Sequence, residues 1–197
     1  MSTPESIEIA KYRQDWWKIF VSALTPIAIA VLTYFITSSL NVKESMLRKS
    51  EQILSEKQKT YSKIGEDLNI IYVYAADVGD YRQFTPNQII DRKRDADRTF
   101  FMYRPYWSGE TQNKYNAFMH AAFEMYAGPG LNAKIKTSDV QKKLAFSAER
   151  KQWDGAWDNM FTGSADPALE QSYYALVSCF LSDIASSAVN SPESCKP

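Results

Sequence analysis

The sequence contains little of the material from which common active sites are built. Its 197 residues include seven glycines, one histidine and two cysteines, and neither sign of charge is in excess, since Lys plus Arg and Asp plus Glu are both 23. There is no Walker A sequence, no G-x-G-x-x-G, no H-E-x-x-H and no G-x-S-x-G. We therefore expect no enzyme, no cofactor, no metal site and no bulk binding of nucleic acid.

The few reactive side chains stand apart from one another. His120 lies beside the apolar stripe of its predicted helix, a position that is typical of a surface histidine. Cys179 and Cys195 form neither a C-x-x-C pair nor a framework, which suits a reducing compartment. Asp154 and Asp158 lie one helical turn apart without a His or Cys nearby, so they indicate a solvated face.

One long stretch carries no charge. Residues 19–42 separate Lys18 from Lys43, and as a helix they would span about 36 Å, against about 30 Å for the hydrocarbon core of a bilayer. Trp16 and Trp17 stand at one end, where aromatic rings anchor membrane helices. A signal peptide has a shorter apolar region, and a core helix seldom runs so far without charge. The sequence predicts a retained transmembrane helix in a lipid bilayer.

The charges on either side of this helix predict its orientation. The N-terminal tail, residues 1–18, holds three Lys or Arg that three acidic residues offset, whereas six Lys or Arg lie between Lys43 and Lys63. Because cytoplasmic flanks carry the excess of positive charge, the N-terminus is predicted outside and residues 43–197 in the cytoplasm. We expect a single-pass protein of the bacterial inner membrane.

One side of the predicted span is small and polar. At about 100° per residue, five such residues fall within an arc of about 80°. Small and hydroxyl-bearing residues allow membrane helices to approach closely and to hydrogen-bond to each other. The stripe predicts self-association into a homo-oligomer, and a lone anchor with a chance stripe is the alternative. Its members are Ser22, Pro26, Ala30, Thr33 and Thr37.

After the span, the pattern remains helical but becomes charged. Apolar residues recur every seven positions from Leu47, but the complementary heptad positions become apolar only from Ile64. Residues 43–60 are therefore predicted as a stalk, either a loose parallel coiled coil or the exposed start of one long helix. A helical domain over 61–190 and a tail over 191–197 follow.

Four further helices begin at recognisable caps. The first is predicted to stop before Pro105, the second at the glycines around Pro129, and the third to break at Gly155. The fold class is therefore predicted as all-α, with one N-terminal transmembrane helix that continues into a stalk and a cytoplasmic bundle of about five helices. Only residues 131–135 alternate like a strand. The caps are the capping box from Thr85 to Gln88, Ser108, Ser138 and Asp166 with Pro167.

The apolar faces of these helices predict the core. Val140 and Leu144 are expected to face inward on the helix that begins after Ser138. Leu181 is expected to face inward on the last helix. The aromatic residues predicted to be buried together are Trp153, Trp157, Phe161, Tyr126 and Phe180.

The most concentrated polar stretch is DRKRDADR, residues 91–98, and it holds the candidate binding site. Arg94 and Arg98 share one helix face, and Arg104 follows among aromatic residues. Guanidinium groups bind phosphate and aromatic rings stack on bases, so this combination suits a small anionic, nucleotide-like ligand. The predicted ligand-binding residues are Arg94, Arg98, Tyr103, Arg104, Tyr106 and Trp107.

The same residues have a simpler interpretation. Asp91 with Arg94 and Asp95 with Arg98 are i,i+3 pairs, and alternating charge on a helix is typical of a solvated face. An intrahelical ladder of ion pairs is therefore the alternative to a ligand site. A second basic group surrounds the predicted loop after Gly128, and it comprises Lys134, Lys136, Lys142 and Lys143.

A resemblance is carried by the stretch TPNQIIDRKRDADRTFFMYRPYWS, followed by YNAFMHAAFEMYAGPG. It is similar to a recurrent pattern in small, uncharacterised bacterial membrane-anchored proteins, over residues 16–165, and it implies membrane anchoring without a particular chemistry. The plan of one membrane helix and a small cytoplasmic domain also resembles the nucleotide-activated membrane effectors of bacterial antiphage defence. That likeness is architectural, so no functional residue is carried over from it.

These observations favour a non-enzymatic binding, sensor or effector module at the membrane that responds to an anionic ligand. One alternative is a scaffold that docks a cytoplasmic protein through exposed aromatic residues. Another alternative is an enzyme with an unrecognised helical site, for which a deep pocket with converging acids would be required.

Overall fold

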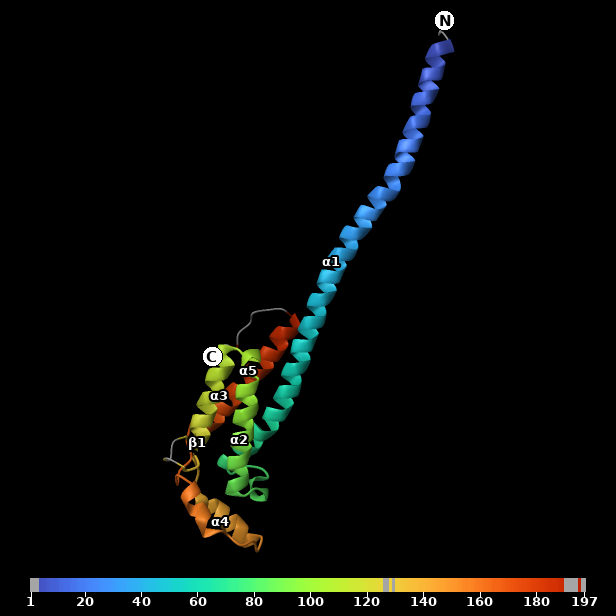
Figure 1. Ribbon diagram of the computed structural model, residues 1–197. Helices are drawn as coiled ribbons and strands as arrows, with labels where there is room; N and C mark the ends of the chain where they lie inside the picture. Colours follow the sequence, from blue (N-terminus) through green and yellow to red (C-terminus); the bar gives the residue numbers. More distant parts are fainter. Residues whose placement is uncertain (1–3, 126–127, 129, 190–194, 196–197) are drawn as a thin grey trace. The chain divides into compact units, whose positions relative to one another are not determined.

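The computed structural model describes residues 4–125, 128, 130–189 and 195, without the side chains of residues 4–15, 17–21, 23, 28, 42, 188 and 189. It is mostly helical, as predicted. It divides into two compact units, Met1–Lys49 and Ser50–Pro197. The described elements are α1 (Pro4–Ala75), η1 (Tyr81–Gln83), α2 (Pro86–Met102), η2 (Arg104–Tyr106), α3 (Gly109–Ala122), β1 (Phe123–Glu124), β2 (Lys134–Ile135), α4 (Asp139–Ala148), η3 (Gly155–Met160) and α5 (Leu169–Val189) (Figure 1).

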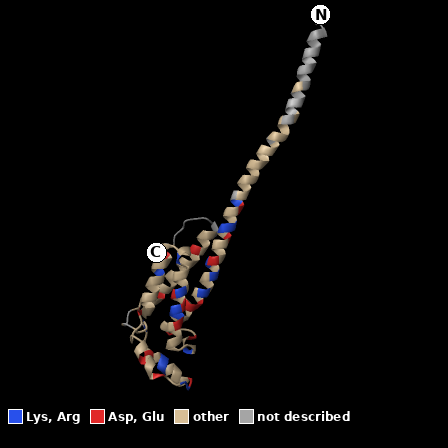
Figure 2. Cartoon of the chain, viewed as in Figure 1, with Lys and Arg blue, Asp and Glu red and all other residues tan. Residues whose placement is uncertain are grey.

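The first unit is the N-terminal part of α1. By length and composition, this helix is long and apolar enough to cross a membrane. Of the α1 side chains that the structure describes, none before Lys43 is charged (Figure 2). Pro26 lies within the helix, and the helix continues past it. The five residues of the predicted self-association stripe are all exposed.

The second unit begins inside the segment predicted as a stalk. α1 runs through residues 43–60 without a break, which agrees with the start of one long helix. The Lys57 Nζ atom donates to the Asp183 carbonyl oxygen at 2.9 Å and to the Ser187 Oγ atom at 2.8 Å. Burial lowers the pKa of Lys57, and the nearby Asp183 carboxylate opposes this shift. α5 therefore already contacts α1 at a position where the sequence predicted exposed stalk.

Two predicted helix starts at the centre of this unit are confirmed. Thr85 forms the capping box with Gln88, and the Ser108 Oγ atom accepts a hydrogen bond from the Thr111 backbone N–H. α3 ends at Ala122, earlier than predicted, because Phe123 adopts an extended backbone and pairs with Ile135 across β1 and β2. This two-stranded antiparallel pair is the exception to the predicted all-α class.

In the C-terminal part, α4 and α5 begin at the predicted caps, but some of the residues predicted to face the core are exposed. Ser138 caps α4, and the Asp166 carboxylate accepts the Ala168 N–H just before α5. Val140 and Leu144 are exposed, so the prediction that they face the core is wrong. Leu181 of α5 is also exposed, contrary to prediction. The buried residues of α4 are instead Lys142, Ala145 and Phe146.

Aromatic contacts join the helices of the second unit. The Phe100 ring of α2 stacks on the Tyr115 ring of α3, with centroids 3.7 Å apart. Phe180 of α5 lies 5.3 Å from the Tyr61 ring of α1. α2, α3 and α5 thereby pack beside the C-terminal part of α1 (Figure 1). The core is therefore centred where α1, α2, α3 and α5 meet.

The predicted aromatic core is confirmed only in part. Phe161 and Phe180 are buried, as expected. Trp153 and Trp157 are half-buried, and they pack against each other at right angles with centroids 5.1 Å apart. Tyr126 lies outside the described residues. The two tryptophans therefore form a satellite cluster around α4 and η3 rather than the centre of the core.

The two cysteines are not separate. Cys179, which is buried in α5, and Cys195 form a disulfide across a separation of 16 residues. The prediction that the two cysteines form no framework is therefore wrong. The sequence gave no signal for this disulfide, because the pairing depends on the path that the chain takes after α5.

Candidate functional site

The exposed face of α2 carries the ladder of ion pairs that the simpler interpretation predicted. The Arg94 Nη1 atom lies 2.8 Å from the Asp91 carboxylate, and the Arg98 Nη1 atom lies 3.4 Å from the Asp95 carboxylate. The Arg94 Nη2 atom also donates to the Asn132 Oδ1 atom at 2.6 Å. A ligand that recruited these guanidinium groups would therefore have to compete with partners already in place.

The turn between α2 and α3 is fixed by hydrogen bonds. The Arg104 Nε atom donates to the Gln112 Oε1 atom at 2.7 Å, and the Gln112 Nε2 atom donates to the Trp107 carbonyl oxygen at 3.0 Å. The Ser108 backbone N–H donates to the buried Asp183 carboxylate of α5 at 2.8 Å. The turn that contains η2 is thus tied both to α3 and to α5, so its shape is set by the surrounding fold.

Trp107 does not lie where the ligand hypothesis placed it. Only 4% of its surface is exposed, and its ring meets the Phe180 ring edge to face at 4.7 Å. Its Nε1 atom is buried and has no hydrogen-bond partner in the described part of the chain. The prediction that Trp107 stacks on a ligand is therefore corrected, because its ring is already packed on α5.

Carbon-rich side chains are exposed at the end of α2. Phe101 and Met102 are 53% and 66% exposed, and both share a helix face with Arg98 through i+3 and i+4 spacing. The Tyr106 ring is also exposed and lies 6.1 Å from the Tyr103 ring. We call this region the α2-end surface, and it comprises Arg98, Phe101, Met102, Arg104 and Tyr106.

Buried polar contacts hold α2 in place behind this surface. The Arg92 Nη1 atom donates to the Asp67 carboxylate of α1 at 2.8 Å. Burial raises the pKa of Asp67, and the bond from Arg92 opposes that shift. The Tyr115 hydroxyl of α3 donates to the Asp97 carboxylate at 2.8 Å. Sequence patterns missed these contacts, although an aspartate on the apolar face of a predicted core helix, as at position 67, is a usable signal.

The second basic group is largely neutralised. The Lys142 ammonium is buried and pairs with the Asp77 carboxylate. Lys143 lies 2.6 Å from the Asp139 carboxylate, and Lys136 lies 3.2 Å from Asp166. These lysines therefore serve contacts within the fold, so they do not supply an open anion site.

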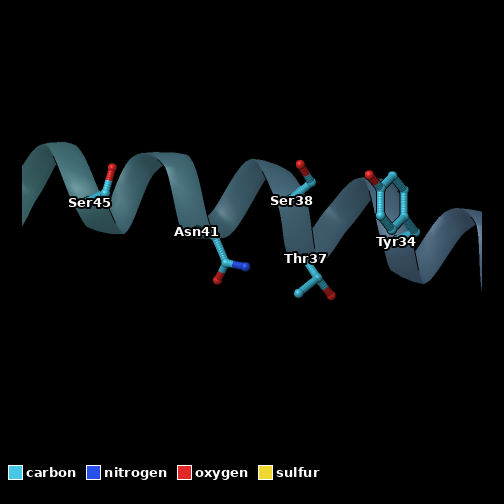
Figure 3. Close-up of a pocket in the computed structure, with 5 residues that line it drawn as sticks. All are labelled: Tyr34, Thr37, Ser38, Asn41 and Ser45. Atoms are coloured by element: carbon cyan, nitrogen blue, oxygen red, sulfur yellow. The ribbon is translucent and has the colours of Figure 1, made fainter.

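An open hollow of about 340 Å³, lined by residues with hydroxyl or amide groups, lies along one side of α1 in the first unit. Figure 3 shows Tyr34, Ser38 and Ser45 along one edge and Thr37 and Asn41 along the other. Thr37 belongs to the predicted self-association stripe, and Asn41 lies one turn further along the same face. The stripe therefore continues almost to the predicted end of the span, with a side chain that can both donate and accept hydrogen bonds.

Comparison with protein-family models, with curated proteins and with solved structures finds no match to this chain. The resemblance described above therefore stays a prediction. Among the described residues, no three His, Cys, Asp or Glu side chains gather as a metal site would require. His120 is exposed, as its sequence position indicated.

Proposed function

We propose that this protein is a membrane-anchored docking module whose α2-end surface binds a partner protein. The exposure of Phe101 and Met102 beside Arg98 carries the proposal. Arginine and aromatic residues dominate the energetics of protein interfaces, and exposed large apolar side chains in one region mark interaction sites. No catalytic role is assigned to any residue.

The surface suits a protein better than a small anion. Arg94 and Arg98 are paired with acidic neighbours, Arg104 is hydrogen-bonded to Gln112 and Trp107 is buried, so four of the six predicted ligand residues are already engaged. A small anion would leave the exposed carbon of Phe101 and Met102 uncovered, whereas a protein surface could cover it. An anionic, nucleotide-like ligand remains the second candidate, and the exposed Arg104 beside the Tyr103 and Tyr106 rings favours it.

Site-specific crosslinking tests the docking proposal. A photo-crosslinking residue at position 102, in the full chain in its native membrane, is expected to form one discrete adduct with another polypeptide. The matched control is position 144, where Leu144 is similarly exposed but lies on α4. Arg98→Ala should reduce the adduct several-fold while stability changes by only about 0–1 kcal/mol, because its ion pair is exposed.

The docking proposal has clear contrary outcomes. Equal labelling at positions 102 and 144, or no adduct at position 102, would contradict it. Nucleotide binding that is lost in Arg104→Ala, without any protein adduct, would instead support the anionic ligand. An adduct that contains only a second copy of this chain would show that the surface joins protomers.

We propose that α1 crosses the bacterial inner membrane once, with the N-terminus outside and the second unit in the cytoplasm. The flanking charges support this orientation. The disulfide weighs against it, because such bonds persist in oxidising compartments and are rare in the cytosol. The fold sets the proximity of the two sulfur atoms, whereas the compartment sets their oxidation state, so the charge rule takes precedence here.

Reporter fusions test the orientation. Green fluorescent protein fused after Pro197 should fluoresce, and alkaline phosphatase at the same position should be inactive. In the same cells, Cys179 and Cys195 should be alkylated by a maleimide after denaturation without reductant, because the cytoplasm keeps thiols reduced. Active phosphatase together with thiols that resist alkylation would invert the topology and place the second unit in an oxidising compartment.

We propose, further, that α1 associates with a second copy of the chain along the polar stripe. Ser22, Thr33 and Thr37 bear hydroxyl groups on this side, and Asn41 adds an amide that is complementary to itself. A second copy inserted in the same orientation places the same groups at the same depth. Such pairing would present two α2-end surfaces on one assembly and so raise the avidity for a multivalent partner.

A further inference from the structure

A second hollow, of about 460 Å³, lies on the loop that leads into η3, far in sequence from the α2-end surface. It is lined by Gln152, Trp153, Asp154, Gly155 and Trp157. We infer that this hollow binds a small organic cation, an alkylammonium group such as choline carries. The inference is independent of the docking function proposed above.

The aromatic walls provide the first reason. The rings of Trp153 and Trp157, which both line the hollow, meet edge to face at 88° with centroids 5.1 Å apart. The Trp157 Nε1 atom is buried without a hydrogen-bond partner among the described residues. The part of this indole that borders the hollow is therefore ring carbon. The electron-rich face of an indole attracts cations more strongly than any other side-chain ring.

The same loop already holds a cation in this manner. The Lys143 Nζ atom lies 5.6 Å from the centre of the Trp153 ring. It is 2.9 Å from the Asp158 carboxylate, which also accepts a hydrogen bond from the Trp153 Nε1 atom. A ring, a carboxylate and an ammonium group thus form one unit beside the hollow. The loop therefore already accommodates an ammonium group between an indole ring and a carboxylate.

The hollow offers a similar pair to an external cation. Asp154 is exposed, and one of its oxygens accepts the Ala156 backbone N–H at 2.9 Å, which fixes the carboxylate at the start of η3. Asp154 and Trp157 both line the hollow, whereas the cations described in this region lie over the Trp153 and Phe146 rings. Lys151, the nearest basic residue in the sequence, is engaged by Glu149 at 2.6 Å and lies over the Phe146 ring. Ring carbon and a fixed carboxylate together select a cation over a neutral molecule of the same shape.

Titration of the full chain with choline tests the inference. The chain is held in an uncharged maltoside detergent, and the indole N–H signals are followed by nuclear magnetic resonance. Millimolar choline should shift the Trp157 signal in a saturable manner. The neutral isostere 3,3-dimethylbutan-1-ol has the same shape without the charge, and it should bind at least about fivefold more weakly if the cation–π contact contributes about 1 kcal/mol.

Variants distinguish choline binding at the hollow from binding elsewhere on the molecule. Asp154→Asn keeps the cap of η3 and should weaken choline binding by about threefold. Trp157→Phe should weaken it by a similar factor, because phenylalanine is a poorer cation acceptor than tryptophan. Trp16→Phe changes an exposed tryptophan of the first unit and should leave binding unchanged. Asp154→Asn keeps the test valid if the Trp157 variant fails to fold.

The contrary outcomes are equally specific. Equal binding of choline and its neutral isostere would show an apolar hollow without selectivity for charge, and it would overturn the inference. No shift of the Trp157 signal, or binding that is unaffected by Asp154→Asn, would do the same. A peptide bearing trimethyllysine that binds at least about tenfold more tightly than choline would identify a protein side chain, rather than a free metabolite, as the source of the cation.

Discussion

Replacing Lys142 with alanine is expected to lower the free energy of unfolding by about 3 kcal/mol. The Lys142 side chain is 1% exposed, pairs with Asp77 and donates to the Thr137 hydroxyl at 2.9 Å. Its ammonium lies 5.0 Å and 5.6 Å from the centres of the Tyr74 and Tyr81 rings. The alanine variant removes the partner of a carboxylate and a hydroxyl and leaves a cavity below both rings.

Conservative variants separate the charge from the volume. Lys142→Met keeps most of the buried chain, and the Asp77 side chain is 29% exposed and can turn to water, so the loss should be smaller than with alanine. The double variant Lys142→Met with Asp77→Asn should recover part of the remaining loss. Asparagine suits position 77, where φ is 58°. Urea denaturation of the full chain in detergent, followed by tryptophan fluorescence, measures each value. A single alanine variant with unchanged stability would contradict the buried pair.

The pH dependence gives a second readout. Burial lowers the pKa of Lys142 from its ordinary value of 10.5, and the Asp77 carboxylate opposes this shift. Between the folded-state pKa and 10.5 the unfolded chain therefore binds more protons, so the contribution of Lys142 to stability rises with pH. The stability of the parent chain relative to Lys142→Met should increase across that window. A difference that stays constant or falls would show that the pair with Asp77 outweighs desolvation.

Local signals in the sequence were sufficient to predict where α2, α3, α4 and α5 begin. Thr85, Ser108, Ser138 and Asp166 each act within two or three residues of the chain, and all four accept the backbone hydrogen bond that a cap predicts. Which residues of α4 are buried, in contrast, depends on contacts with distant parts of the chain. Lys142 is buried beside Ala145 and Phe146, and its ammonium pairs with Asp77, which lies 65 residues away, so the period of apolar residues within α4 could not reveal that a lysine faces the interior.

The candidate site divides in the same way. The pairing of Arg94 with Asp91 and of Arg98 with Asp95 is local, and the i,i+3 spacing predicted it. The position of Trp107 depends on its contact with Phe180, a residue of the last helix. The sequence around Trp107 gave no signal of that long-range contact. The sequence therefore described the exposed face of α2 better than the turn that follows it.

Replacing Trp107 with alanine is expected to cost about 4 kcal/mol of the free energy of unfolding, a larger loss than for Lys142→Ala. The loss comes from removing a ring that is 4% exposed and packed on Phe180, which in turn contacts the Tyr61 and Phe100 rings. The variant therefore loosens α1, α2 and α5 together. Thermal unfolding of the full chain, followed by near-ultraviolet circular dichroism, measures the loss.

Two further variants make this prediction specific. Trp107→Phe keeps an aromatic ring and removes an indole N–H that is buried without a partner among the described residues, so it should cost much less than alanine. Trp157→Ala changes a half-buried tryptophan of the satellite cluster and should also cost less than Trp107→Ala. If Trp107→Ala instead left the melting temperature unchanged and abolished binding of a nucleotide, the ring would face a ligand after all. That outcome would restore the anionic-ligand site and remove the reason to favour a protein partner at the end of α2.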